Sequence, residues 1–199
     1  IKQVDGAGPT TFSGALLTDD PSAIGIDLTG NIFNINSGAL TIGDGRVEIT
    51  NSGLLTISSV GGLLLTGSFV QNGTGAVSTG GDIETTADDI SFATAVTLTN
   101  NVQLTTGAGI GNISFGSTVD GDFNLTLLAG LGTVTANAAI GGTTSLEKLD
   151  ILSAATSDLR LVRTEEGGIS VVSSSIVLRD NLLTNTASTN NAGNVSLTG

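Results

Sequence analysis

The chain has no cysteine, histidine, tryptophan, tyrosine or methionine among its 199 residues. Without cysteine it can form no disulfide and offers no thiol nucleophile. Without histidine, most hydrolytic triads and the ordinary zinc sites are excluded. Catalysis by a serine–lysine pair would depend on Lys2 or Lys148, and neither lies in a sequence context that suggests such a site.

Positive charge is also scarce, with 6 lysines and arginines against 18 acidic residues and a net charge of −12. No basic residue occurs between Arg46 and Lys148. A nucleic-acid partner needs a positive footprint, and an anionic membrane surface would repel this chain. Since no run of about 20 apolar residues is present, we do not expect membrane insertion. The acidic excess favours a role in solubility, with weak Ca²⁺ binding by surface aspartates as the alternative.

The residues that are abundant favour strands. Glycine occurs 29 times but proline only twice, and the aromatic content of 3% is all phenylalanine. The rest of the chain is rich in aliphatic residues, serine, threonine and asparagine, a mixture that suits short strands and tight turns better than helices. A hydrophobic content of 39% and a mean hydropathy of +0.33 argue against disorder.

The strongest signal is an internal repeat, in which residues 90–112 align with residues 113–135 at an offset of 23. Apolar and polar residues alternate in both copies, which indicates short strands with one buried face. The matched apolar positions are Ile90, Phe92, Val96, Val102 and Leu104 in the first copy and Ile113, Phe115, Val119, Leu125 and Leu127 in the second.

Three such strands per repeat predict an all-β fold, a parallel β-helix (β-solenoid) with about 21–25 residues per coil. We expect one domain over residues 1–199, with 1–23 as a possible terminal segment and the clearest repeats in 82–155. Each coil stacks on the next at about 4.8 Å. The matched apolar residues should therefore form ladders inside the bore, which leaves little room for the wide rings that the sequence lacks.

Matched polar residues and glycines are predicted to lie at the corners of the coil. Stacked asparagine amides would hold one corner, as side-chain ladders do in cross-β structures. Glycine would supply the positive φ that other corners require. The corner asparagines are Asn101 and Asn124, and the corner glycines are Gly107, Gly109, Gly130 and Gly132.

Upstream of residue 82 the repeat is looser. An offset of 23 aligns Leu40 and Ile42 with Leu63 and Leu65, and it aligns Val47 with Val70.

Downstream, Leu149 and Ile151 lie 24 residues after Leu125 and Leu127. Residues 144–155 also fit a helix with a capping box. We prefer a strand over 149–151 because it fills the position that the repeat leaves open.

The cadence of residues 82–155, with ISF, VTLTNNVQLTTGAG and NLTLLAGLGTVTANAAIGG in succession, resembles the repeat tracts of large secreted bacterial adhesins of the filamentous-haemagglutinin and autotransporter type. This resemblance implies a right-handed β-helix, export to the cell surface and an adhesive or scaffolding role, and it implies no catalytic residues. The bias of parallel crossovers also favours the right-handed coil. The Asn-Pro-Asn-Gly stretch of the amino-terminal secretion domain is absent, so the chain would correspond to part of the shaft or to a stand-alone relative.

Asp120, Asp122 and Asn124 place oxygen ligands at alternate positions, as at the start of a Ca²⁺ loop. The closing glutamate is replaced by Leu131, and a polar turn is the preferred interpretation. We therefore expect no cofactor, with Ca²⁺ as a weak candidate. Enzymes that act on polysaccharides, a frequent use of this fold, need bases beside acids and aromatic platforms, and the middle of this chain has neither.

The sequence thus predicts a structural or adhesive, non-catalytic segment of an extracellular bacterial surface protein. The expected partners are flanking coils of a longer chain, copies of itself, or a host or matrix surface. The alternative is a filament or sheath subunit whose open end coils pair between copies, because such heterologous pairing makes fibres.

Overall fold

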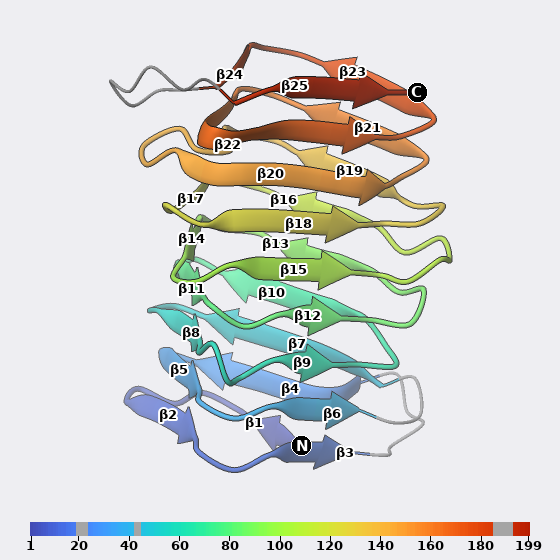
Figure 1. Ribbon diagram of the computed structural model, residues 1–199. Coiled ribbons are helices and arrows are strands. Elements are labelled where there is room, and N and C mark those ends of the chain that lie inside the picture. The colour runs from blue at the N-terminus through green and yellow to red at the C-terminus, as the bar shows by residue number, and fades with distance from the viewer. Residues whose placement is uncertain (19–23, 42–44, 185–192) are drawn as a thin grey trace.

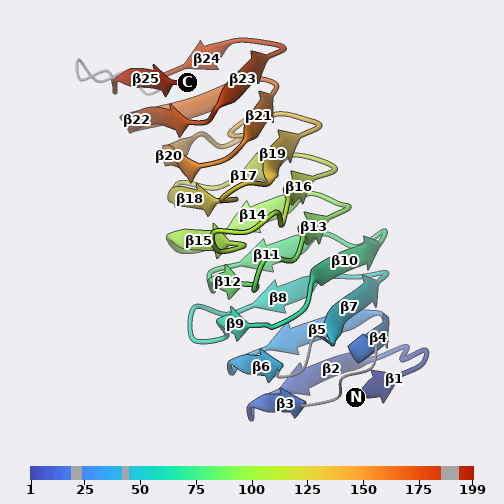
Figure 2. The same cartoon turned by 90° about the vertical axis from the view of Figure 1, so that its right-hand side faces the viewer.

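The computed structural model describes residues 1–18, 24–41, 45–184 and 193–199, and it contains no helix within these ranges. The chain is a parallel β-solenoid (Figure 1). It runs along the back, turns at one side, returns along the front and climbs by one strand spacing per coil, which makes the coil right-handed (Figures 1 and 2). The predicted fold class is confirmed.

Three parallel sheets run along the solenoid axis. The first sheet contains β1 (Lys2–Gln3), β4 (Ile24–Gly30), β7 (Arg46–Asn51), β10 (Phe69–Gly73), β13 (Ile90–Phe92), β16 (Ile113–Phe115), β19 (Thr133–Ala136), β21 (Thr156–Leu159) and β23 (Ser175–Leu178). The second contains β2 (Pro9–Phe12), β5 (Ile32–Ile35), β8 (Leu55–Ile57), β11 (Val77–Thr79), β14 (Val96–Leu98) and β17 (Val119–Asp120).

The third sheet contains β3 (Leu16–Thr18), β6 (Ala39–Thr41), β9 (Leu63–Leu64), β12 (Ile83–Glu84), β15 (Val102–Thr105), β18 (Asn124–Leu128), β20 (Leu146–Ser153), β22 (Val162–Val172) and β24 (Leu182–Leu183), and β25 (Val195–Thr198) also pairs with β22. The first strands, β1 to β3, join these sheets as a complete coil. The segment that the sequence marked as a possible terminal edge is therefore part of the solenoid as far as Thr18.

The register of the clearest repeat is the predicted one. Ile90 pairs with Ile113 and Phe92 with Phe115, an offset of 23 in each case. Val96 pairs with Val119. The same holds in the third sheet, where Val102 pairs with Leu125 and Leu104 with Leu127.

Upstream, the uniform offset of 23 was wrong by one residue in two sheets. Val47 pairs with Phe69, an offset of 22, so the phenylalanine takes the inward position and Val70 faces out. Leu40 pairs with Leu64, an offset of 24. Ile42 lies outside the described residues. Both errors have the same cause. Because the loops differ in length, the offset between paired residues differs from one sheet to another within a single coil. An alignment of whole repeats uses one offset for all three sheets and cannot show this difference.

Residues 146–153 form strand β20, so the preferred strand is confirmed and the alternative helix was wrong. Leu125 pairs with Leu149 and Leu127 with Ile151, as the offset of 24 predicted. A strand is favoured over a helix here because it pairs in parallel with β18 and so continues the third sheet.

The bore is filled by aliphatic side chains that stack in columns. None of the ten predicted ladder residues is more than 2% exposed. The rings of Phe92 and Phe115 are stacked with centroids 5.7 Å apart and an interplanar angle of 4°, and Phe69 adds a tilted ring 5.3 Å from Phe92. Burying apolar surface contributes about 25 cal/mol per Å², so this continuous column is the main source of stability.

Replacing Val119 with aspartate tests the assignment of buried and exposed positions. Val119 is 0% exposed, and an unpaired carboxylate in an apolar bore is strongly unfavourable. We expect V119D to lower the free energy of unfolding by more than about 4 kcal/mol, measured by urea denaturation.

The matched control is S114D, on the outward face of β16 between Ser91 and Thr135. It should cost less than about 1 kcal/mol. Equal losses in the two variants would contradict the assignment.

Candidate functional site

A buried polar network interrupts the apolar bore where the first sheet turns into the second. Asn51 and Gln71 are both 0% exposed. Gln71 Nε2 donates to Asn51 Oδ1 at 2.7 Å, and Asn51 Nδ2 donates to the carbonyl oxygen of Gly53 at 2.6 Å. Gln71 Oε1 accepts from the backbone N–H of Ala93 at 3.0 Å and from the hydroxyl of Thr94 at 3.2 Å. Two amides thus bind three successive coils together at this corner.

Replacing Gln71 with leucine should destabilise the protein although leucine is more apolar. The substitution leaves Asn51 Oδ1 without its donor inside the bore, which costs about 1–3 kcal/mol. Chemical denaturation of Q71L measures the loss. The comparison is S91A on the outward face of β13, which removes a hydroxyl without entering the bore and should be nearly neutral. A stabilised Q71L would show that the network is dispensable.

Short polar side chains tie successive coils together on the outside. In each case a side-chain oxygen accepts a hydrogen bond from a backbone N–H of the following coil, at 2.7–3.0 Å. The acceptor–donor pairs are Asp82 with Gln103, Asp89 with Asn112, Asn101 with Asn124, Asn112 with Thr133 and Asp120 with Thr143. We call these hydrogen bonds inter-coil staples. Two of the acceptors, Asp82 and Asp89, lie before the clearest repeat, and their role was not predicted from the sequence.

The predicted corner asparagines do lie one above the other. Their bond runs from the Asn124 backbone N–H to Asn101 Oδ1 at 3.0 Å. Asn124 itself pairs with Lys148 in the next coil, so no third asparagine continues the column. A hydrogen bond from a backbone N–H to a side-chain oxygen therefore holds this corner, in place of the predicted stack of side-chain amides.

Two of the four corner glycines have the predicted positive φ, 71° at Gly107 and 55° at Gly130. Gly109 and Gly132 do not, so their predicted conformation was wrong. Their role is close approach between coils. A Cβ at Gly132 would overlap the carbonyl oxygen of Gly111, and one at Gly109 would overlap the side chain of Ala87.

Gly132→Ala should therefore be costly although its φ is unexceptional. Two coils would have to separate at this corner, and we expect a loss of about 2–4 kcal/mol in the free energy of unfolding. Gly14→Ala is the control, because nothing lies within 4 Å of the Cβ that it would add. Thermal denaturation should leave G14A within about 0.5 kcal/mol of the parent chain. A G132A variant as stable as G14A would exclude steric crowding at this corner.

Two of the residues considered for Ca²⁺, Asp120 and Asp122, have different surroundings in the structure. Asp120 Oδ1 accepts from the backbone N–H groups of Thr143 and Thr144, at 2.7 and 3.1 Å, and so shapes the loop 141–145. Asp122 lines a separate hollow of about 400 Å³, together with acidic residues of β20 and β22. Among the described residues, no three acidic side chains are grouped closely enough to hold a metal ion.

The described part of the chain has four ion pairs on its outer faces. Two of them join neighbouring coils, Lys2–Asp27 and Arg179–Asp158, and two lie within a single strand, Arg46–Glu48 and Lys148–Asp150. The bidentate pair is that of Arg179 with Asp158. Both guanidinium–carboxylate contacts are 2.6 Å. This hydrogen bonding lowers the pKa of the Asp158 carboxyl and raises the pKa of the Arg179 guanidinium. Exposed pairs of this kind contribute little to stability.

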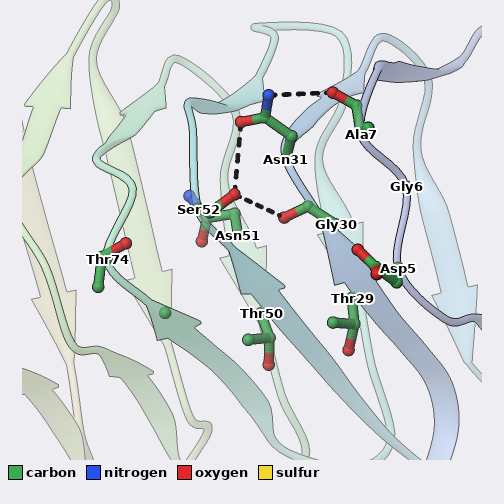
Figure 3. A pocket seen from close by; sticks show the side chains of 11 residues that line it. Asp5, Gly6, Ala7, Thr29, Gly30, Asn31, Thr50, Asn51, Ser52 and Thr74 are labelled. Carbon is green, nitrogen blue, oxygen red and sulfur yellow. Dashed lines mark hydrogen bonds between the residues drawn. The ribbon is translucent and has the colours of Figure 1, made fainter.

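A hollow lies at a corner of the amino-terminal half, where β4, β7 and β10 end (Figure 3). It has a volume of about 430 Å³ and opens to solvent. Asn31 Nδ2 donates to the carbonyl oxygen of Ala7 at 3.1 Å, and the Ser52 hydroxyl contacts both Asn31 Oδ1 and the carbonyl oxygen of Gly30 at 3.4 Å. These bonds hold one wall.

The open side of this hollow presents polar groups from successive coils. Thr29 on β4 and Thr50 on β7 are directly paired in register and face outward. Asp5 lies on one side of them, toward the first coil, and Thr74 lies on the other (Figure 3). The side chains of these four residues make no hydrogen bond or ion pair with the rest of the described chain.

The carboxyl end of the solenoid exposes side chains that occupy core positions. Leu178 pairs with the buried Leu159 and is 41% exposed, and Leu197 pairs with the buried Val171 and is 44% exposed. Val195 is 46% exposed for the same reason. At these three positions no further side chain of the described residues covers the column.

The first coil is more polar. Gln3 and Thr10 occupy inward positions, in register with Leu28 and Phe33. The hydroxyl of Thr10 donates to Gln3 Oε1 at 3.1 Å. This hydrogen bond satisfies polar groups at the entrance of the bore, so the two ends of the solenoid are chemically different.

Comparison with known proteins gave no match to a family model, to a curated protein or to a solved structure. A search of the described residues found no helix with the length and apolar character needed to cross a bilayer.

Proposed function

We propose that this chain is a non-catalytic structural and adhesive segment of an extracellular bacterial surface protein. The observation that carries the proposal is the uninterrupted solenoid: the first sheet contains nine strands in axial order, from β1 to β23. Such an architecture is a rigid spacer whose faces are available to partners along its length. The resemblance of residues 82–155 to the repeat tracts of secreted adhesins adds support.

The chemistry of the surface agrees with a passive role. The hollows are lined by hydroxyls, amides and carboxylates, and the sequence has no histidine or cysteine to serve as base or nucleophile. An excess of acidic residues disfavours nucleic acid as a partner. The partners we propose are neighbouring coils and a host or matrix surface.

A second candidate function is a self-assembling filament or sheath subunit. It is favoured by the exposed core-position side chains of the last coil, Leu178, Val195 and Leu197. The outermost strand of a parallel sheet has one unpaired edge, and such an edge is a template for further pairing. A first coil of one copy stacked on the last coil of another would continue the three sheets.

Microscopy and adhesion of the purified 199-residue chain distinguish these functions. For a surface segment we expect monodisperse rods of about 40 Å, eight strand spacings, by small-angle X-ray scattering, and retention of coated beads on a cell or matrix surface. Long uniform fibres in negative stain would favour the filament. Turnover of a polysaccharide, or beads that bind no better than albumin-coated controls, would contradict the adhesive proposal.

A further inference from the structure

We propose that the hollow formed by the first four coils binds a neutral oligosaccharide lying along the solenoid axis. This inference rests on the adhesive function proposed above and names the ligand class for it. The site is the row of Asp5, Thr29, Thr50 and Thr74 (Figure 3). Its volume of about 430 Å³ lies in the range of small-ligand pockets, about 300–1,000 Å³.

The shape of the hollow favours an extended ligand. Its polar groups come from four successive coils, which are spaced at about 4.8 Å. The row from Asp5 to Thr74 therefore extends over three spacings, about 14 Å. Gly30 and Gly73 line the hollow with backbone alone, and a Cβ at either position would run into neighbouring atoms, Gly6 and Phe33 at Gly30 and the Asn51 backbone at Gly73. A chain of sugar rings fits this shape better than a compact ligand does.

The chemistry of the hollow favours hydroxyl groups. Each threonine hydroxyl can donate one hydrogen bond and accept others, and an ionised carboxylate accepts strong, short bonds from hydroxyl donors. Since Asp5, Thr29, Thr50 and Thr74 have no partner within the described parts of the chain, a ligand can use all four without breaking an internal bond. The wall bonds of Asn31 and Ser52 keep the corner in shape.

Other ligand classes fit less well. No lysine or arginine lines the hollow, and Asp5 would repel a phosphate, a sulfate or an acidic sugar. A divalent cation prefers several carboxylates, and Asp5 is the single acidic residue of the lining. An apolar ligand would find little beyond Ala7 and the threonine methyl groups. Because no aromatic ring is available for stacking, we expect weak binding that becomes effective through multivalent display.

The test begins with a glycan array that contains neutral, sialylated and sulfated oligosaccharides, probed with the labelled full chain. The best neutral glycan is then titrated by ¹H–¹⁵N NMR into the parent chain, into D5N and into the double variant T29V/T50V. The matched control is T97V/T126V, which removes outward hydroxyls from β14 and β18.

We expect neutral glycans to dominate the array and to shift the amides of residues 5–7, 50–52 and 74. Affinity should fall at least fivefold in D5N and in T29V/T50V and stay unchanged in T97V/T126V. Preference for acidic glycans, no glycan binding, or binding that D5N and T29V/T50V leave intact would overturn the inference. Bead adhesion that persists in T29V/T50V would reject this site while the adhesive function stands; absence of adhesion by the parent chain would reject the function itself.

Discussion

The structure depends on parallel backbone hydrogen bonding between successive coils, with inward residues of one coil placed over inward residues of the next. Every strand of the solenoid obtains its partners from residues about two dozen positions away in sequence, so no coil is stable by itself. The columns of buried side chains follow from this register. A residue that does not fit its column disturbs two neighbours, which is why a single inward charge at Val119 is expected to be so damaging.

The same constraint explains the composition. A bore that admits one column of side chains per strand position selects branched aliphatic residues, and the few rings are tolerated where they can stack on one another, as Phe92 does on Phe115. Polar residues that enter the bore near a turn can satisfy one another, as Asn51 and Gln71 do. Glycine marks the places where adjacent coils come into backbone contact.

Much of this could be predicted from the sequence, because columns repeat chemistry at a fixed interval. The inward positions of Ile90, Phe92 and their equivalents followed from alternation and offset alone. The upstream register did not, because the loop lengths differ between the sides of a coil there and Val47 and Val70 share a residue type without sharing a column. The staples formed by Asp82 and Asp89 were also missed. Their sequence signal is only an acidic residue beside a strand, which surface charge produces equally well.

The candidate binding hollow could not be anticipated either. Asp5, Thr29, Thr50 and Thr74 are separated by intervals of 24, 21 and 24 residues and belong to no common motif. Thr29 and Thr50 become neighbours because 21 residues close one circuit of the solenoid there, and Asp5 and Thr74 reach the same hollow from the coils on either side. The residues of a ligand site in this architecture come from successive coils and are therefore far apart in the sequence. A comparison of short sequence motifs cannot detect such a site.

The five inter-coil staples on the outside of the solenoid all have the same donor–acceptor direction along the chain. In all five of them the accepting side chain belongs to the earlier coil and the backbone donor to the later one. A completed coil thus displays carbonyl or carboxylate oxygens that are already in place when the next stretch of polypeptide arrives. Growth from the amino terminus, the order in which a ribosome delivers the chain, meets an acceptor that is already in place at these five positions. Growth in the opposite sense would have to order these five accepting side chains afterwards, whereas the bond from the Gly130 backbone N–H to Ser153 Oγ of the following coil has the reverse order. The preference for one direction of assembly therefore belongs to the middle coils, where the five bonds lie.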